Sequence, residues 1–123
     1  MDAAASPYTF NLDVKFAPLE TIDVNEIVHA NKPWFNQTLS QINGSVLRVG
    51  IVEGEFHWHK HDEDDELFFV LSGKLFVDTE RGNFELGPNQ GVTVPKGVLH
   101  RTRALEKTVM LMVENAGIQP AGD

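Results

Sequence analysis

The chain has 123 residues, which is enough for one domain with a single core and excludes multidomain machinery. Eighteen acidic against ten basic residues give a net charge of −8 with His neutral, so nucleic-acid backbones and anionic membrane surfaces would be repelled. The chain has no cysteine, which excludes disulfides, thiolate metal ligands and a cysteine nucleophile. Because no apolar run approaches the ~18 residues of a membrane helix and the first residues lack the composition of a secretory signal, we expect a cytoplasmic protein.

The two ends of the chain and one segment near the N-terminus differ from the rest. Residues 1–7 and 118–123 are small, polar or Pro-containing, and we expect both ends to fray. Asp23 is a helix-capping residue type with Glu26 three positions on, which favours a short helical turn over Asp23–Ala30. We expect residues 1–123 to form a single domain.

From Phe35 to Glu114, short runs of β-branched, aromatic and Leu residues recur between Gly, Pro, Asn and Asp clusters, with no sustained helical period. This pattern predicts an all-β domain whose barrel core spans about residues 35–114. The expected strands are 35–42, 45–52, 56–61, 66–72, 74–78, 83–86, 91–94, 99–103 and 108–114. Because about nine short strands leave edges that must be closed or covered, a barrel, sandwich or jelly roll is favoured over an open sheet.

Three of the five histidines, His57, His59 and His61, lie at alternate positions of one predicted strand. Side chains at alternate positions of a strand point to the same face, so one face would carry three imidazoles. Glu66 begins the next predicted strand, and a hairpin with a solvated tip at Asp62–Asp65 would bring its carboxylate beside His59 and His61. His100 begins a strand far along the chain. Three imidazoles and one carboxylate that converge in a cavity would form an open site for a divalent first-row metal.

The spacing of these residues also resembles a known family. His59, His61, Glu66 and Gly73 follow the pattern H-x-H-x4-E-x6-G, which is the first motif of the cupin superfamily.

The second cupin motif, G-x5-P-x-G-x2-H-x3-N, is resembled by Pro95, Gly97 and His100. The chain departs from this motif at both ends, where Asn89 and Ala104 take the Gly and Asn positions. The resemblance implies a small single-domain cupin, that is, a jelly-roll β-barrel. It also implies one divalent transition metal (Fe, Mn, Ni, Zn or Cu). The implied ligands are His59, His61, Glu66 and His100.

Other residues are candidates for the walls of the same cavity. Arg48 either faces solvent or enters the cavity, because its neighbours Leu47 and Val49 form the opposite, apolar parity of its strand. An inward Arg48 would suit a substrate carboxylate through a bidentate pair. The strand parity of His57 points it inward, which makes it a candidate catalytic group that carries a proton. The candidate substrate-binding residues are Arg48, Phe68, Met110 and Met112.

These observations favour a metal-dependent enzyme that acts on an oxygen-rich small molecule by isomerase, lyase or dioxygenase-type chemistry. A non-catalytic cupin module that binds a small ligand or a metal is the alternative, and a metal-free structural cupin is a third possibility. The expected partners are a small-molecule substrate and, by resemblance to small cupins that pair through an N-terminal segment, a second copy of the chain. In such a homodimer, Tyr8–Phe16 would pair with the partner's sheet.

Overall fold

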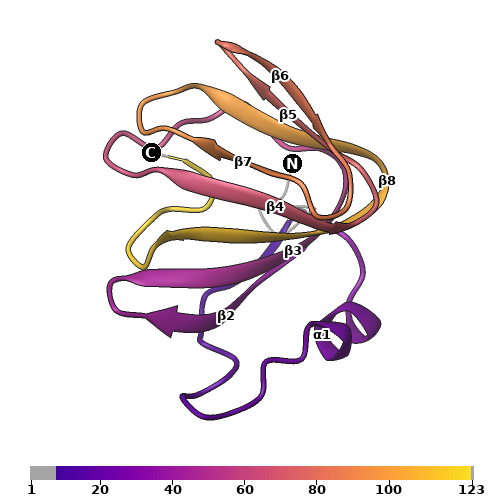
Figure 1. The fold of residues 1–123 in the computed structure, drawn as a ribbon, viewed down its shortest axis with the longest axis vertical. Helices are drawn as coiled ribbons and strands as arrows, with labels where there is room; N and C mark the ends of the chain where they lie inside the picture. Colours follow the sequence, from indigo (N-terminus) through magenta and orange to yellow (C-terminus); the bar gives the residue numbers. More distant parts are fainter. Residues whose placement is uncertain (1–7, 123) are drawn as a thin grey trace, which may run out of the picture.

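The computed structural model describes residues 8–122 of the chain (Figure 1). In chain order, the elements are β1 (Thr9–Asn11), α1 (Val24–Ala30), β2 (Phe35–Ile42), β3 (Ser45–Glu55), β4 (Glu66–Ser72), β5 (Leu75–Thr79), β6 (Gly82–Leu86), β7 (Gly91–Val94) and β8 (His100–Asn115). The all-β prediction and its single short helix are confirmed. No helix in the described part of the chain is long and apolar enough to cross a membrane.

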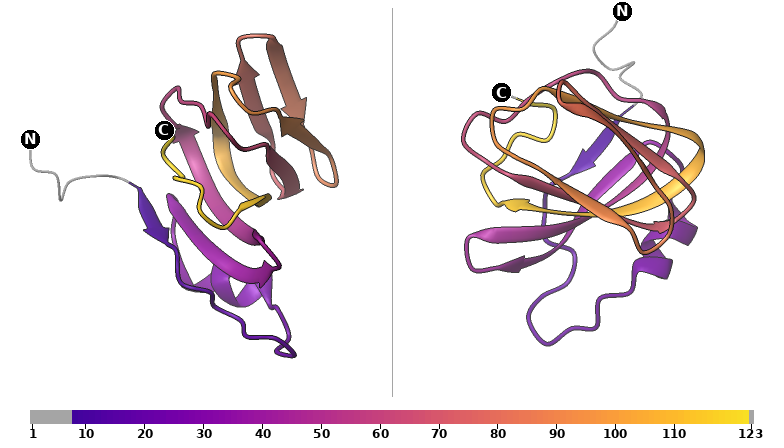
Figure 2. Two further views of the ribbon diagram at one scale, coloured as in Figure 1. Left: turned by 90° about the vertical axis from the view of Figure 1, so that its left-hand side faces the viewer. Right: turned by 45° about the horizontal axis from the view of Figure 1, so that its top comes forward.

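The strands curve around a common interior in the order β1-β2-β3-β8-β4-β7, with β5 and β6 added through β8 (Figures 1 and 2). The first residues of β8, from His100 to Arg103, pair with β5, and Val109–Val113 pair with β4, while β3 pairs along β8 from Arg103 to Asn115 with a register shift. The sequence predicted two strands here, at 99–103 and 108–114. They are one 16-residue strand because the exposed segment around Leu105 continues the extended backbone from one side of the barrel to the other.

The predicted strand at 56–61 is absent from the described structure, and this prediction was wrong. β3 runs on to Glu55, with a register shift between Val52 and Gly54. Beyond it, the chain crosses to β4 without regular pairing, apart from a bridge between His59 and His100. Two hydrogen bonds form this bridge, from His59 N to His100 O at 2.9 Å and from His100 N to His59 O at 2.8 Å. The backbone at His59 is therefore held by hydrogen bonds to the start of β8 and does not belong to a separate strand.

Helix α1 begins where the sequence predicted, because the Asp23 side chain accepts a hydrogen bond from Glu26 N at 3.3 Å. Ile27 of α1 packs against Val49 and Ile51, on the face of β3 that points away from the barrel interior. β1 pairs in parallel with β2 of the same chain, from Thr9 opposite Phe35 to Asn11 opposite Gln37. The segment proposed for a partner's sheet thus has a strand to pair with in its own chain, and the homodimer stays a prediction.

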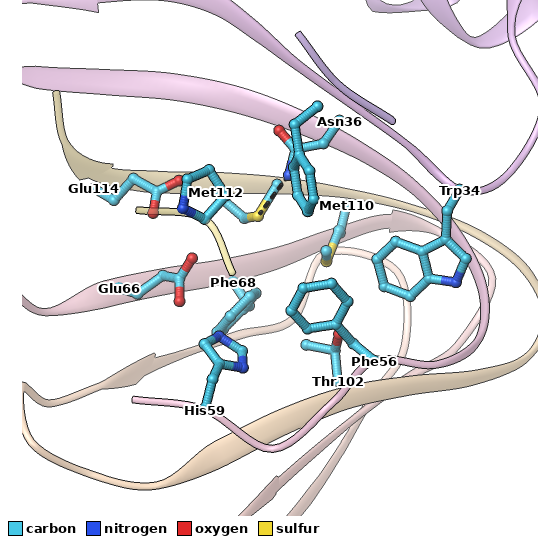
Figure 3. A pocket seen from close by; sticks show the side chains of 12 residues that line it. Trp34, Asn36, Phe56, His59, Glu66, Phe68, Thr102, Met110, Met112 and Glu114 are labelled. Atoms are coloured by element: carbon cyan, nitrogen blue, oxygen red, sulfur yellow. Dashed lines mark hydrogen bonds between the residues drawn. The ribbon is translucent and has the colours of Figure 1, made fainter. Parts of the chain in front are cut away.

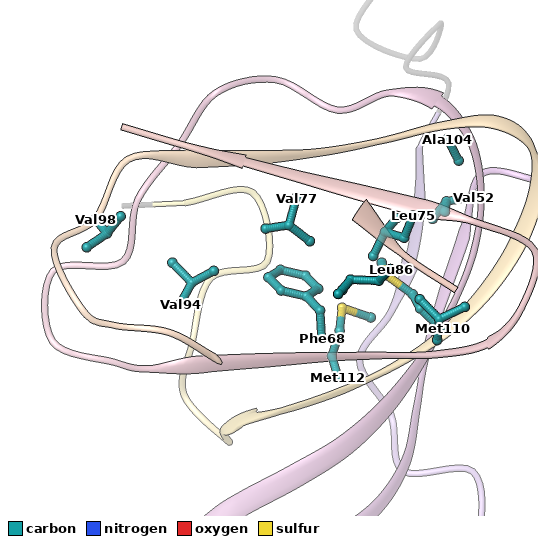
Figure 4. Close-up of a cluster of buried hydrophobic side chains, with 11 residues drawn as sticks. Val52, Phe68, Leu75, Val77, Leu86, Val94, Val98, Ala104, Met110 and Met112 are labelled. Carbon is teal, nitrogen blue, oxygen red and sulfur yellow. The ribbon is translucent and has the colours of Figure 1, made fainter. Parts of the chain in front are cut away.

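The barrel interior is filled by a cluster of apolar side chains from β3 to β8 (Figure 4). Among them, Phe68, Met110 and Met112 are less than 4% exposed, as predicted for residues that share the interior face. Because α1 covers the other face of β3, both parities of that strand are buried. This resolves the two alternatives for Arg48, whose side chain points inward and is 3% exposed.

The C-terminal segment, which the sequence predicted to fray, makes contacts with the rest of the chain. Ile118 is 5% exposed and donates a hydrogen bond from its N–H to Asn115 O at 3.1 Å. Further on, Ala121 O accepts a hydrogen bond from His57 Nε2 at 2.7 Å. These contacts attach the segment to the rim of the barrel, and they could not be predicted from its small and polar composition. Residues 1–7 and Asp123, the other positions expected to fray, lie outside the described residues.

Gly73, the glycine of the first motif, sits at a turn that tolerates no side chain. Its φ is 87°, and a Cβ there would lie 2.5 Å from Thr108 Oγ1 and 2.9 Å from Lys107 O. We expect Gly73→Ala to lower the free energy of unfolding by about 3 kcal/mol, through the positive φ and the backbone clash together. Gly54→Ala is the matched control, because Gly54 has a φ of 91° but nothing within 4 Å, so we expect a loss of about 1 kcal/mol. Urea unfolding measures both, and equal losses would contradict the clash.

Candidate metal centre

Four predicted ligands meet at one end of the barrel interior. Glu66 and His100 are the first residues of β4 and β8, and His59 is fixed to His100 through the backbone bridge. His61 is fixed in the same way, because its carbonyl oxygen accepts a hydrogen bond from Gly97 N at 2.8 Å. One ligand atom from each of the four residues lies within 4.8 Å of the others, as required for a shared ion. All four side chains are buried or nearly so, and none is more than 9% exposed.

His61 provides the test of whether these residues fit a metal. Its side chain is 2% exposed, and among the described residues neither ring nitrogen has a hydrogen-bond partner. Nε2 lies 3.3 Å from Glu66 Oε1, outside hydrogen-bond geometry. A buried imidazole whose nitrogens are unsatisfied costs free energy, whereas a metal ion coordinated by one nitrogen would satisfy it. The donor set of three imidazoles and one carboxylate therefore fits a divalent transition metal.

Backbone carbonyls orient two of the imidazoles. His59 Nδ1 lies 3.0 Å from His57 O, and His100 Nδ1 lies 2.8 Å from Val98 O. Because a carbonyl oxygen only accepts, both Nδ1 atoms carry the proton and donate it. In the neutral His59 ring, Nε2 is then a free base, which is the arrangement of a metal-ligating histidine whose other nitrogen is held by a backbone carbonyl. His100 Nε2 lies 3.3 Å from Glu66 Oε1, a carboxylate of the same cluster.

Burial and local hydrogen bonds shift the pKa values of two ligands in the direction that metal binding needs. Burial lowers the pKa of His59 to about 4, so this ring is neutral at neutral pH. Burial alone would raise the pKa of Glu66, but its contacts with His100 and His61 hold the pKa at about 2. Glu66 is therefore ionised, and His59 is available as a base, across the physiological range.

Two of the four candidate ligands, His59 and Glu66, border a cavity whose remaining wall is largely apolar (Figure 3). The cavity volume is about 20 Å³, which is enough for a single water molecule. Pro120 of the C-terminal segment contributes to this wall, so the segment helps to close the cavity. Besides His59 and Glu66, the wall is formed by Phe10, Trp34, Asn36, Phe56, Phe68, Thr102, Met110, Met112, Glu114 and Pro120.

Three of the four predicted substrate-binding residues line this cavity, namely Phe68, Met110 and Met112, but Arg48 does not. Its Nε and Nη2 donate to Asn36 Oδ1 at 2.9 and 2.6 Å, and its Nε lies 3.4 Å from Glu114 Oε1. A guanidinium already paired in this way lacks the open bidentate face that a substrate carboxylate would need. These contacts do not favour Arg48 as the group that binds such a carboxylate, and that role stays a prediction.

Sequence reasoning missed Glu114 and Asn36. Glu114 follows Met110 and Met112 at alternate positions of β8, so the parity that pointed to the two methionines also pointed to this carboxylate. This parity was not enough to predict a buried Glu114, because an acidic residue near the end of a predicted strand is ordinarily solvated. Asn36 belongs to β2, which pairs with β3, and only the tertiary structure brings it to the cavity.

His57, the predicted proton carrier, lies at the rim. Its side chain is exposed, so the parity argument that placed it inside failed together with the strand on which it rested. Its ring packs on Phe56, with centroids 4.2 Å apart, and lies 5.3 Å from the ring of His59. His57 is thus next to the ligand cluster and attached to the C-terminal segment through Ala121.

Comparison with known proteins gives the family. The sequence pattern of the Cupin domain family matches residues 47–114, which is more than half of the chain. The uncharacterised protein YdbB of Bacillus subtilis is 40% identical over 81 residues, covering 65% of this chain and 72% of the relative.

Solved structures agree. A cupin-2 domain containing protein from Shewanella frigidimarina is 30% identical with a TM-score of 0.73, covering 77% of this chain and 94% of that one. A protein from Neisseria meningitidis is 26% identical with a TM-score of 0.70, covering 78% and 99%. With the motifs, the barrel and these matches together, the chain belongs to the cupin family.

Proposed function

We propose that this cupin is a metal-dependent enzyme that acts on an oxygen-rich small molecule, with one divalent transition metal held by His59, His61, Glu66 and His100. The observation that carries the proposal is the convergence of these four side chains around His61, whose buried nitrogens lack partners among the described residues. Three neutral ligands and one carboxylate leave positive charge on a divalent ion. Such an ion supplies Lewis-acid polarisation of a carbonyl or carboxylate and, if it is iron or manganese, oxygen chemistry.

The chain's own residues would supply the rest of the reaction. Glu66 would neutralise part of the positive charge of the divalent ion, and its histidine neighbours keep its carboxylate ionised. The aromatic and thioether wall excludes water, which strengthens electrostatic interactions inside the cavity. His57 is retained as the group that moves a proton, because its ring lies beside that of His59, with the ring centroids 5.3 Å apart.

One observation favours the alternative of a non-catalytic module that binds a metal or a small ligand. The cavity is nearly filled, and the contacts of Pro120 and Ala121 hold the C-terminal segment across its rim. A substrate larger than water would have to displace this segment, whereas a metal ion alone would not. The cytoplasmic location and the homodimer remain predictions.

Metal analysis tests the proposal directly. Protein purified without a His-tag should contain close to one transition metal per chain. Addition of saturating metal at ~100 times its Kd to the metal-free protein should raise the free energy of unfolding by about 2.7 kcal/mol. The proposal would be contradicted if the purified protein contained no metal and its melting temperature did not change on addition of iron, manganese, nickel, copper or zinc.

A further inference from the structure

Two segments near the ends of the described chain help to close the cavity. β1 contributes Phe10 to its wall, and the C-terminal segment contributes Pro120. β1 is held by its parallel pairing with β2, and the residues that follow it donate two further backbone hydrogen bonds to β2, each 3.0 Å long. Because several backbone hydrogen bonds would have to break together before β1 could move, β1 is the fixed part of this wall.

The C-terminal segment consists of an anchored base and a lightly attached turn. The base is fixed by Ile118, which is 5% exposed, and by a hydrogen bond from Ala116 N to Gly44 O at 2.9 Å. Residues 119–122 form the turn, which is closed by a backbone hydrogen bond from its last residue to its first at 2.9 Å. None of these four residues is buried. The turn can therefore move without exposing a buried side chain of its own.

His57 and Gly122 define how the turn is held on the barrel. Among residues 8–122, the hydrogen bond from His57 Nε2 to Ala121 O, at 2.7 Å, is the only one that joins the turn to the barrel. Gly122 lies directly on a candidate metal ligand, since a Cβ there would be 2.6 Å from His59 Cβ and 3.2 Å from His59 Cδ2. The turn therefore closes over His59 with a glycine backbone and is attached there through the neighbouring histidine.

The closed turn leaves the cavity too small for any organic molecule. The cavity volume of about 20 Å³ holds one water molecule, and Pro120 of the turn is part of the wall. Movement of the turn would remove this part of the wall. Segments with few buried contacts and few hydrogen bonds to the rest of a protein open locally without general unfolding. Entry to the cavity is therefore expected by movement of this turn, with β1 in place.

We propose that residues 119–122 form a lid, latched by His57, that opens to admit a molecule larger than water to the cavity. The inference rests on the proposed function for the nature of that molecule, which is the substrate at the metal. The lid itself is a property of the metal-free chain and is tested there. A lid of this kind keeps bulk water from the site until a substrate enters, as the closing loops of many enzymes do.

Oxidation of the two cavity methionines by tert-butyl hydroperoxide measures opening, because this reagent is larger than the closed cavity. Met110 and Met112 line the cavity and are 2% and 3% exposed. Each thioether takes one oxygen atom from the peroxide, which gives methionine sulfoxide and tert-butanol. The protein is kept metal-free with a chelator, and mass spectrometry of its peptides gives the rate of oxidation at each methionine.

His57→Phe removes the latch and keeps an aromatic ring next to Phe56. We expect both cavity methionines to be oxidised about three to ten times faster in this variant, which is the change in open population that loss of one hydrogen bond produces. Gly122→Ala displaces the lid independently, since the added methyl group would collide with His59, and it should also accelerate oxidation. Gly117→Ala is the matched control in the same segment, because a Cβ there meets nothing within 4 Å, and it should be oxidised at the rate of the unmodified chain.

Amide hydrogen exchange in β8 separates lid movement from general unfolding. We expect protection of the β8 amides to be the same in the unmodified chain, His57→Phe and Gly122→Ala. Equal oxidation rates in these three proteins would overturn the lid, and so would a faster oxidation matched by loss of β8 protection. The expected rates in a chain that binds no metal would support the lid and contradict the proposed function alone.

Discussion

Replacing Glu66 with alanine is expected to weaken the binding of a divalent transition metal by more than about a hundredfold. Loss of an outer partner of a ligand typically costs 10- to 100-fold in metal affinity, and Glu66 is itself the one carboxylate among the four candidate ligands. The three remaining histidines would form a neutral donor set with a lower affinity for a divalent ion. Competition against a chromophoric chelator measures the change.

Two companion variants make the Glu66 experiment specific. Glu66→Gln keeps the shape of the side chain and removes its charge, so it should also lose metal while the fold is retained. Glu63→Ala removes an exposed carboxylate only three positions away and should bind metal normally. Metal affinity in Glu66→Gln equal to that of the unmodified chain would show that this carboxylate is not a ligand.

The metal-free protein is expected to lose stability as the pH rises from 6.5 to 9, because of Glu114. Burial, together with the neighbouring Glu66 carboxylate, raises the pKa of Glu114 to about 9, although Arg48 opposes the shift. A carboxyl whose pKa is raised in the folded state stabilises the fold below its unfolded pKa and loses that contribution as the pH rises towards the folded pKa. Across these 2.5 pH units the unfolded chain has released a proton that the folded chain retains, so the free energy of unfolding falls by about 3 kcal/mol.

Urea unfolding at pH 6.5 and pH 9 in the presence of a chelator measures this effect. Glu114→Gln cannot titrate and should remove most of the alkaline loss. Glu63→Gln changes the formal charge of the chain by the same amount at an exposed position and should leave the loss intact. An alkaline loss of the same size in Glu114→Gln would assign it to other groups.

Local patterns were sufficient for most of the barrel. The strands β2, β4 and β7 begin and end where alternation and turn residues placed them. Asp23 marked the start of α1 for a similar local reason, since its side chain pairs with a backbone N–H three residues on. The strand predicted at 56–61 failed because alternating histidines and aromatic residues satisfy a strand pattern, while the described structure pairs this segment through an isolated bridge between His59 and His100 and through single backbone hydrogen bonds.

The candidate metal ligands could also be predicted from the sequence, but the contacts of the residues around them could not. His59, His61, Glu66 and His100 came from motif spacing, which holds even though the parity argument for their segment did not. The role of Arg48 could not be predicted, because the sequence does not show that α1 covers the other face of β3 or that Asn36 and Glu114 occupy the guanidinium.

By itself, the sequence determined the fold class, the extent of the barrel and the four residues that can hold a metal, because each depends on residue type and short-range spacing. Tertiary structure alone decided the chemistry of the cavity. It buries Glu114 next to Glu66, it turns Arg48 towards Asn36, and it brings Pro120 and Ala121 to the rim. Around the cavity, contacts join residues up to 76 positions apart, as between Asn36 and Met112. No local pattern encodes which distant partner will neutralise or cover a buried group.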